Sequence, residues 1–106
     1  MQDLSFIVKG TMLKKDPSCS FRRLMMGTQN WYRAVFSFDE NWNGFAIVAE
    51  FQANNEDPIY MPVNHNICMI PNYLSNYNQY SLRLIGQKNS SRIVTNNVKI
   101  TQNGGR

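Results

Sequence analysis

The sequence predicts an all-β protein of about seven short strands, arranged as a sandwich or a small barrel. Apolar and polar residues alternate with a period of two in several short runs, which is typical of half-buried strands. Clusters of Asn, Gly, Pro and Asp separate the runs at intervals of about 8–12 residues. The chain of 106 residues fits one domain, and its 42% hydrophobic and 17% charged residues argue against disorder.

The first third of the chain contains one clear strand and one unclear segment. Residues 4–9 alternate and end at Gly10, and residues 11–14 are predicted to continue the strand beyond a bulge or kink at that glycine. Residues 15–18 contain an Asp-Pro pair, which favours a turn. Residues 19–29 are rich in basic residues and methionine and show no clear period, so we expect a strand or an irregular loop there.

The middle third contains the strongest predicted strand, over residues 31–38, whose even-numbered positions are expected to share one face. A polar loop over residues 39–44 follows. Residues 45–51 are apolar on both faces for part of their length, which is typical of a central strand. Residues 54–58 predict a hairpin connection into a strand over residues 59–63.

The last third alternates turns with short strands. The predicted elements are, in order, a turn at His65 and Asn66, a strand over 67–70, a helical turn from Pro71 to Leu74, a strand over 79–86, a turn over 88–91 and a strand over 92–101. We therefore predict a single domain over residues 1–101, followed by a flexible C-terminal tail over residues 102–106.

The charge pattern favours protein partners over nucleic acid. The formal net charge is +4, but the stretch from Asp39 to Asp57 contains five acidic residues and no Lys or Arg. This polarised pattern suits docking against protein surfaces at least as well as binding to a phosphate backbone. No run approaches the roughly 18 apolar residues of a membrane span, and the N-terminus lacks the features of a secretory signal.

The sequence contains no pattern typical of a catalytic, cofactor-binding or metal site. The two cysteines, Cys19 and Cys68, and the single histidine, His65, are too few ligands for a structural zinc site. We expect two buried, reduced thiols, and a bridge between them stays open as an alternative. Cys68 and His65 are not expected to act as nucleophile and base, because residues three apart on a turn and a strand rarely converge.

Five side chains are candidates for an interaction surface. Trp42 lies in the polar loop, and Tyr73 and Tyr77 are the tyrosines expected to be most exposed. Arg22 and Arg23 add positive charge in the unclear segment. Such aromatic residues also leave stacking on sugars or bases open, but most of the aromatic residues fall in phase with the predicted core, so a carbohydrate or nucleic-acid site is not favoured.

Ordered motifs between Phe36 and Ile100 are similar to those of a domain found in tailed phages and prophages of low-GC bacteria. That family has a strand ending in F-x-F-D, an x-W-x-G loop, an A-x-F strand, a Tyr-led strand, a C-x-x-P segment, a strand ending in Gly and an I-x-T-N strand. The corresponding residues here are 36–39, 41–44, 49–51, Tyr60, 68–71, 82–86 and 93–96.

The resemblance implies an immunoglobulin-like antiparallel β-sandwich of about seven to eight short strands, of the kind found at the N-terminus of baseplate upper proteins and related tail or fibre components. It implies a non-enzymatic attachment module of the virion, without a cofactor, whose partners are other virion proteins or further copies of the chain. In such a sandwich we expect Trp42 to pack as a lid on one end, and Thr95 and Asn96 to satisfy turn and edge groups.

A virion structural role is therefore the leading hypothesis, in the baseplate or tail, in a fibre attachment or as a capsid decoration. Two other functions stay open. The short chain and its acidic stretch suit a small phage-encoded inhibitor that binds a host defence or regulatory protein. The tyrosines and the loop tryptophan suit a carbohydrate-binding module.

Overall fold

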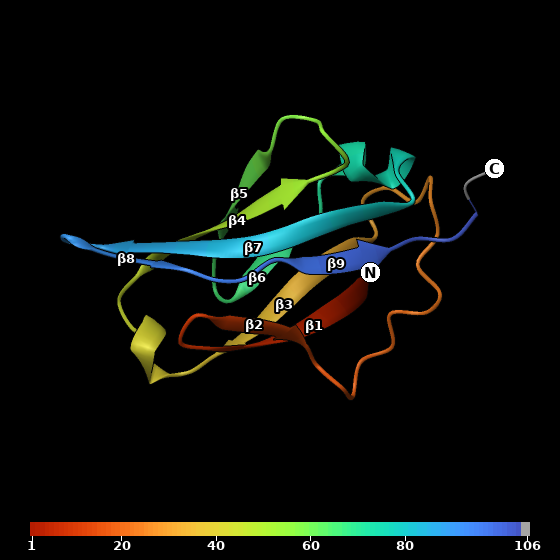
Figure 1. The fold of residues 1–106 in the computed structure, drawn as a ribbon. Coiled ribbons are helices and arrows are strands. Elements are labelled where there is room, and N and C mark those ends of the chain that lie inside the picture. The colour runs from red at the N-terminus through yellow and green to blue at the C-terminus, as the bar shows by residue number, and fades with distance from the viewer. Residues whose placement is uncertain (105–106) are drawn as a thin grey trace.

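Two β-sheets packed face to face form the protein (Figure 1). The computed structural model describes residues 1–104. Within these residues the chain forms two short 3₁₀ helices, η1 (Glu40–Trp42) and η2 (Asn72–Asn76), and nine strands, which are β1 (Gln2–Lys9), β2 (Met12–Lys15), β3 (Tyr32–Phe38), β4 (Ala46–Gln52), β5 (Ile59–Val63), β6 (Ile67–Met69), β7 (Gln79–Lys88), β8 (Ser91–Val94) and β9 (Val98–Thr101). The predicted all-β sandwich is confirmed, with nine strands in place of seven or eight.

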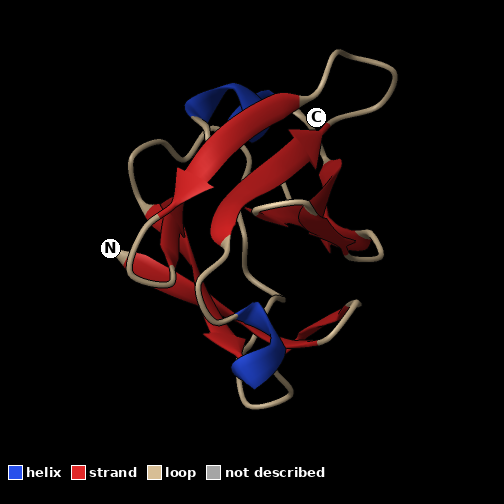
Figure 2. Ribbon diagram, turned by 90° about the vertical axis from the view of Figure 1, so that its left-hand side faces the viewer, coloured by secondary structure: helices blue, strands red, loops and turns tan. Residues whose placement is uncertain are grey.

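The core lies between the two sheets, and Figure 2 shows the two helical turns at opposite ends of the sandwich. The first sheet has the strand order β2-β1-β3-β6; in the second, β4 lies between β5 and β7, and both β8 and β9 pair with β7. The central position predicted for β4 is confirmed. The predicted alternation also holds in β3 and β7, whose buried residues include Tyr32, Ala34, Phe36, Tyr80, Leu82 and Leu84.

The N-terminal segment forms a hairpin rather than one continued strand. β1 and β2 pair antiparallel, with Lys9 opposite Met12. Gly10 has a φ of +56°, a region that glycine reaches without steric cost, so a two-residue turn reverses the chain there. The predicted continuation of the first strand through residues 11–14 is therefore wrong, because the glycine marks a reversal and not a bulge.

One strand pair is parallel, which corrects the prediction of a fully antiparallel sandwich. β1 and β3 run in the same direction, with Gln2 opposite Tyr32 and Val8 opposite Phe38. A parallel pair needs a long connection, and β2 together with residues 16–31 provides it. Residues 19–29 form the irregular part of this connection, which is one of the two predicted alternatives.

The predicted last strand over residues 92–101 is divided into β8 and β9. Between them, Thr95 Oγ1 accepts a hydrogen bond from the Leu84 amide at 2.9 Å. The Asn96 side chain reaches the other sheet, where it accepts from the Leu13 amide at 2.7 Å and donates to the Leu13 carbonyl at 3.0 Å. Thr95 thus stays bonded to β7 within its own sheet, and Asn96 links the two sheets, so both satisfy turn and edge groups as predicted. Regular pairing with β7 is interrupted at Asn96.

Replacing Asn96 with alanine should destabilise the fold by about 1–3 kcal/mol. The change leaves the amide and carbonyl of Leu13 without their side-chain partner, and Leu13 is 1% exposed. The neighbouring Asn97 is exposed and its side chain bonds to no described residue, so Asn97→Ala is the matched control, with an expected change below about 0.5 kcal/mol. Urea unfolding followed by fluorescence measures both. Equal stability of the two variants would contradict the bridging role.

Residues 102–104 pack against the rest of the sandwich, so the domain boundary predicted after Thr101 is too early. Gln102 is 6% exposed, and its side-chain amide donates to two carbonyls at the end of η2, at 3.0 and 2.8 Å. The Asn103 side chain donates to a carbonyl of the irregular loop at 2.7 Å. These bonds hold the loop, η2 and the C-terminal segment together. Residues 105 and 106 of the predicted tail lie outside the described residues.

Candidate interaction surface

Trp42 lies inside the sandwich and contributes almost nothing to the exposed surface. Its side chain is 3% exposed, and its Nε1 donates to the Gly10 carbonyl at 2.9 Å. The indole packs against Phe38 and Phe45, with ring centroids 5.3 and 6.1 Å away. The predicted lid is confirmed. The prediction that Trp42 belongs to an interaction surface is wrong, because the neighbouring rings cover it.

Asp39 also binds Gly10 of the β1–β2 turn, at its amide rather than at the carbonyl that Trp42 binds. Its Oδ2 accepts from the Gly10 amide at 3.0 Å, and its Oδ1 accepts from the Asn41 amide at 3.2 Å, capping η1. The amide and the carbonyl of Gly10 are therefore both bound by the segment that follows β3. The F-x-F-D and x-W-x-G motifs thus have a structural role here, since they close one end of the sandwich over the β1–β2 turn.

Tyr73 and Tyr77 lie at the opposite end of the sandwich, in η2 and directly after it (Figure 2). Tyr73 is 38% exposed and Tyr77 is half-buried, whereas Tyr60, in β5, is 56% exposed. The prediction that Tyr73 and Tyr77 are the most exposed tyrosines is therefore wrong, because Tyr77 packs against the core and Tyr60 points outward from an edge strand. Their hydroxyl oxygens are 2.7 Å apart, and this hydrogen bond raises the pKa of Tyr73 above its ordinary value. The two rings meet edge to face at an interplanar angle of 61°. Rings at this angle do not form one flat stacking platform, which weakens the carbohydrate interpretation.

Arg22 and Arg23 are exposed on the irregular loop. A hydrogen bond of 2.9 Å from the Gly27 amide to a carbonyl of η2 joins this loop to the end that carries the two tyrosines. The structure therefore brings four of the five predicted surface residues toward one end of the molecule and separates Trp42 from them.

Both cysteines are free thiols. Cys68 is buried, as predicted, and burial raises the pKa of its thiol to about 12. Cys19 is half-buried rather than buried, and its Sγ accepts from the Ser5 amide at 3.4 Å. In the part of the chain that the structure describes, no group of three or more His, Cys, Asp or Glu side chains is placed to hold a metal ion.

A thiol reagent such as DTNB should modify Cys19 and spare Cys68 in the folded protein at pH 8. Because the thiolate is the reacting form, a thiol with a pKa of about 12 is only about one part in ten thousand reactive at that pH. We expect one reactive thiol per chain before denaturation in guanidinium and both thiols after it. In the control variant Cys19→Ser, a fast-reacting thiol in the folded state would contradict this account.

The outer face is the side of the five-stranded sheet that points away from the core. Its side chains form rows that run across the strands. Residues opposite each other in neighbouring strands point to the same side, so the registers define each row. The first row holds Ala46, Gln87 and Arg92; the second holds Pro62, Val48, Ile85 and Val94; the third holds Tyr60, Glu50 and Arg83; the fourth holds Gln52, Ser81 and Lys99.

The second row is apolar across four strands. Val48, Ile85 and Val94 are half-buried and Pro62 is exposed. A groove of 540 Å³ runs beside this row toward the β5–β6 turn. Pro62 lies on the edge strand β5, where a residue without an N–H group hinders the addition of a further strand. This row therefore favours contact with a partner's side chains over extension of the sheet.

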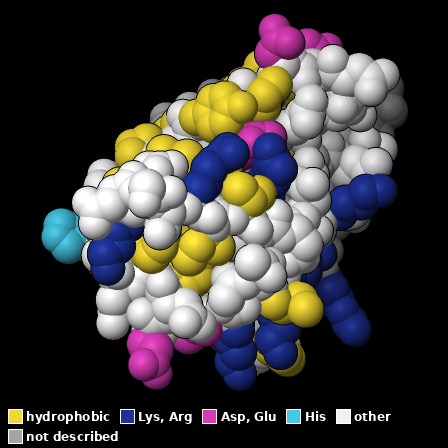
Figure 3. All heavy atoms as spheres, turned by 60° about the vertical axis from the view of Figure 1, so that its left-hand side comes forward, with side chains coloured by type: hydrophobic (Ala, Val, Ile, Leu, Met, Phe, Trp, Pro, Cys, Tyr) yellow, Lys and Arg dark blue, Asp and Glu magenta, His cyan; other side chains and the backbone are white. Residues whose placement is uncertain are grey.

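The third row contains an ion pair, and the outer face is basic. Glu50 is 9% exposed, and its Oε1 lies 2.9 Å from Nη2 of Arg83, which neutralises the carboxylate. The rows hold three basic residues, Arg83, Arg92 and Lys99, against one acidic residue, so three minus one leaves two excess positive charges. Figure 3 shows a side of the molecule on which hydrophobic side chains lie among Lys and Arg side chains.

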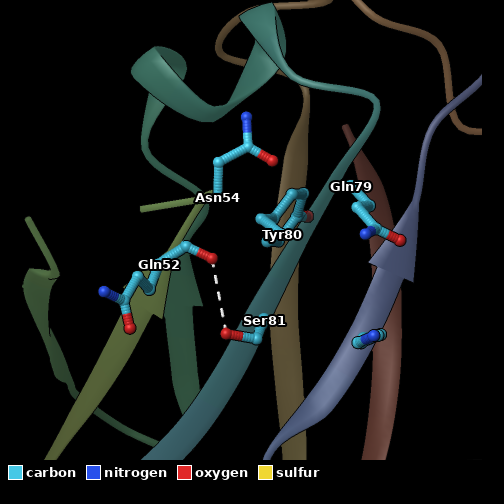
Figure 4. A pocket seen from close by; sticks show the side chains of 6 residues that line it. Gln52, Asn54, Gln79, Tyr80 and Ser81 are labelled. Carbon is cyan, nitrogen blue, oxygen red and sulfur yellow. Dashed lines mark hydrogen bonds between the residues drawn. The ribbon is translucent and has the colours of Figure 1, made fainter. Parts of the chain in front are cut away.

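The fourth row borders a polar hollow of 230 Å³ between β4, β7 and β9 (Figure 4). Its lining residues are Gln52, Asn54, Gln79, Tyr80, Ser81 and Lys99, so no acidic residue is among the described residues that line it. Tyr80 is 3% exposed, and its ring is therefore not available for stacking on a ligand. The hollow offers side-chain amides, one hydroxyl and one ammonium group.

Sequence reasoning missed the outer face. Apart from β4, which is apolar on both faces by sequence, its strands are recognised by their inward phase, and an outward phase is polar in most half-buried strands. The signal that marks it is the apolar character of Val48, Ile85 and Val94 at outward positions. That signal becomes visible only when the registers place these residues in one row.

These features define a small β-sandwich with a mixed apolar and basic sheet face. No protein-family model matches the chain, and no curated protein and no solved structure matches it either. None of the helices in residues 1–104 is long and apolar enough to cross a membrane.

Proposed function

We propose that the protein is a non-enzymatic structural component of a bacteriophage virion, assembled in the host cytoplasm and acting through protein–protein contacts. Its place would be in the baseplate or tail, in a fibre attachment or as a capsid decoration. The ordered motifs that resemble the attachment domain of baseplate upper proteins support the phage assignment. An immunoglobulin-like module of this kind joins other virion proteins or further copies of itself.

The outer face is the observation that carries the docking role. It combines an apolar row with basic residues on well-paired strands, and protein interfaces commonly have an apolar centre and a polar rim. The motif residues Asp39, Trp42 and Asn96 are instead bonded within the domain. The motif residues that carry the resemblance therefore stabilise the fold, and the outer face would select the partner.

Quantitative mass spectrometry of purified phage particles tests this proposal. Particles are produced from the bacterial strain that carries the coding sequence and are banded repeatedly on a density gradient. We expect the chain to stay at a constant ratio to the major capsid protein through successive bands. Its absence from the particles, with specific co-purification of one host protein from infected cells, would contradict the virion role and favour the inhibitor.

A further inference from the structure

We infer that the hollow beside Lys99 binds a carboxylate group, supplied by an acidic side chain of a protein partner that docks on the outer face. This inference rests on the proposed docking function, and it specifies the chemistry of the partner.

The size and charge of the hollow select this ligand. Its volume of 230 Å³ is below the range of about 300–1,000 Å³ that small-molecule sites occupy, so it suits a single side chain better than a whole cofactor. Lys99 is exposed and forms no hydrogen bond or ion pair with residues 1–104. Because no acidic residue lines the hollow, its ammonium group is free to pair with an incoming anion.

Side-chain amides complete the site. Asn54 and Gln79 make no side-chain hydrogen bond within the described residues, and each carries an NH₂ donor. Figure 4 shows these two side chains on either side of Tyr80. Below Tyr80 in the same view, the Ser81 hydroxyl donates to the Gln52 carbonyl at 3.3 Å and joins β7 to β4. Two free amide donors and one ammonium group match the acceptor oxygens of a carboxylate.

The apolar row indicates where the rest of the partner lies. Ser81 in the fourth row and Ile85 in the second are four residues apart on β7, which corresponds to about 13 Å along a strand. A second copy of the chain packed face to face would place Arg92 and Lys99 among like charges, which disfavours it as the occupant. The matching partner instead presents a carboxylate and an apolar side chain about 13 Å apart, as two residues four positions apart on an extended segment do.

An NMR titration of the ¹⁵N-labelled full chain with two peptides tests this inference. The first peptide, acetyl-Glu-Ser-Thr-Ser-Leu-amide, carries both groups at the required spacing, and the second has Gln in place of Glu. We expect the acidic peptide to shift the side-chain amide signals of Asn54 and Gln79. It should also bind roughly fivefold more tightly than the peptide with Gln in place of Glu. Lys99→Gln should abolish the difference, whereas the control Lys9→Gln, on the other sheet, should preserve it.

Three results would overturn the inference: no shift at the hollow, equal binding of the two peptides, or a difference that survives in Lys99→Gln. A short oligothymidylate is the third probe, and Lys99-dependent binding that is tighter than that of the acidic peptide would identify a phosphate backbone as the ligand instead. These measurements use the isolated chain. Their failure therefore leaves the particle experiment unaffected, and absence from particles leaves the peptide result standing.

Discussion

Replacing Trp42 with alanine should lower the free energy of unfolding by about 3–5 kcal/mol. The indole is 3% exposed, packs against Phe38 and Phe45, and donates to the Gly10 carbonyl. Its removal leaves a cavity at one end of the sandwich and an unpaired carbonyl in the β1–β2 turn. Because small domains have only about 5–15 kcal/mol of stability, the variant should be close to unfolding at room temperature. Urea denaturation followed by circular dichroism measures the change.

The second tryptophan provides the matched control for this experiment. Trp31 is 48% exposed, and its hydrogen bond to Gln2 uses the backbone carbonyl, which alanine keeps. We expect Trp31→Ala to change stability by less than about 1 kcal/mol. A similar loss of stability in both variants would show that Trp42 does not close the sandwich in the way described.

Gly86→Ala should destabilise the protein by about 1–3 kcal/mol, although alanine usually stabilises a position that it can adopt without strain. A Cβ atom at Gly86 would lie 2.7 Å from Cζ3 of Trp42 and 3.2 Å from Cδ2 of Phe45. Since the φ of Gly86 is not positive, backbone strain plays no part, and the cost is a steric clash. This clash reverses the usual sign of the substitution. Thermal or urea unfolding of the variant measures it.

The background Trp42→Phe isolates the cause of this loss. The smaller ring removes the indole atoms that the new methyl group meets, so the cost of Gly86→Ala should fall by about 1 kcal/mol or more in a double-mutant cycle. An unchanged cost in the two backgrounds would mean that the Trp42 ring is not what forbids a side chain at this position.

Strands with one buried face could be predicted from the sequence. In β3 and β7 the large apolar residues recur at every second position, and the structure buries them as expected, for example Phe36 and Leu84. The alternation depends only on the geometry of an extended chain with one dry side, which is a local property. The burial of Cys68 follows instead from the general tendency of free thiols to pack as small hydrophobes, which holds for Cys68 and not for the half-buried Cys19.

Features that depend on distant partners could not be predicted in this way. Asn96 lies in an apparently continuous strand, and only the position of Leu13, 83 residues away, shows why pairing breaks there. By sequence alone, Gly10 is compatible with a bulge or with a reversal of the chain, and only the antiparallel pairing of β2 with β1 distinguishes the two. The parallel pairing of β1 with β3 is likewise a property of the whole connection, not of either strand.

In the candidate surface, too, the exposure of a side chain depends on residues that are distant in the sequence. Trp42 looks like an exposed loop residue by sequence, because a polar loop surrounds it, yet it packs under Phe45 and beside the β1–β2 turn. Tyr73 and the two arginines of the irregular loop are exposed, whereas Tyr77 is half-buried, because contacts with distant core residues cover part of its ring. The outer face needed three strand registers at once to become visible.

Lysine acetylation of intact particles tests the central claim, that the protein docks in a virion through its outer face. Purified particles and the free protein are treated with the same acetylating reagent, and the modified peptides are quantified. We predict that Lys99 is protected in the particle relative to the free protein, while Lys9 and Lys14, on the outward side of the other sheet, stay reactive. Lys99 that reacts equally in particles and in the free protein would contradict docking through this face.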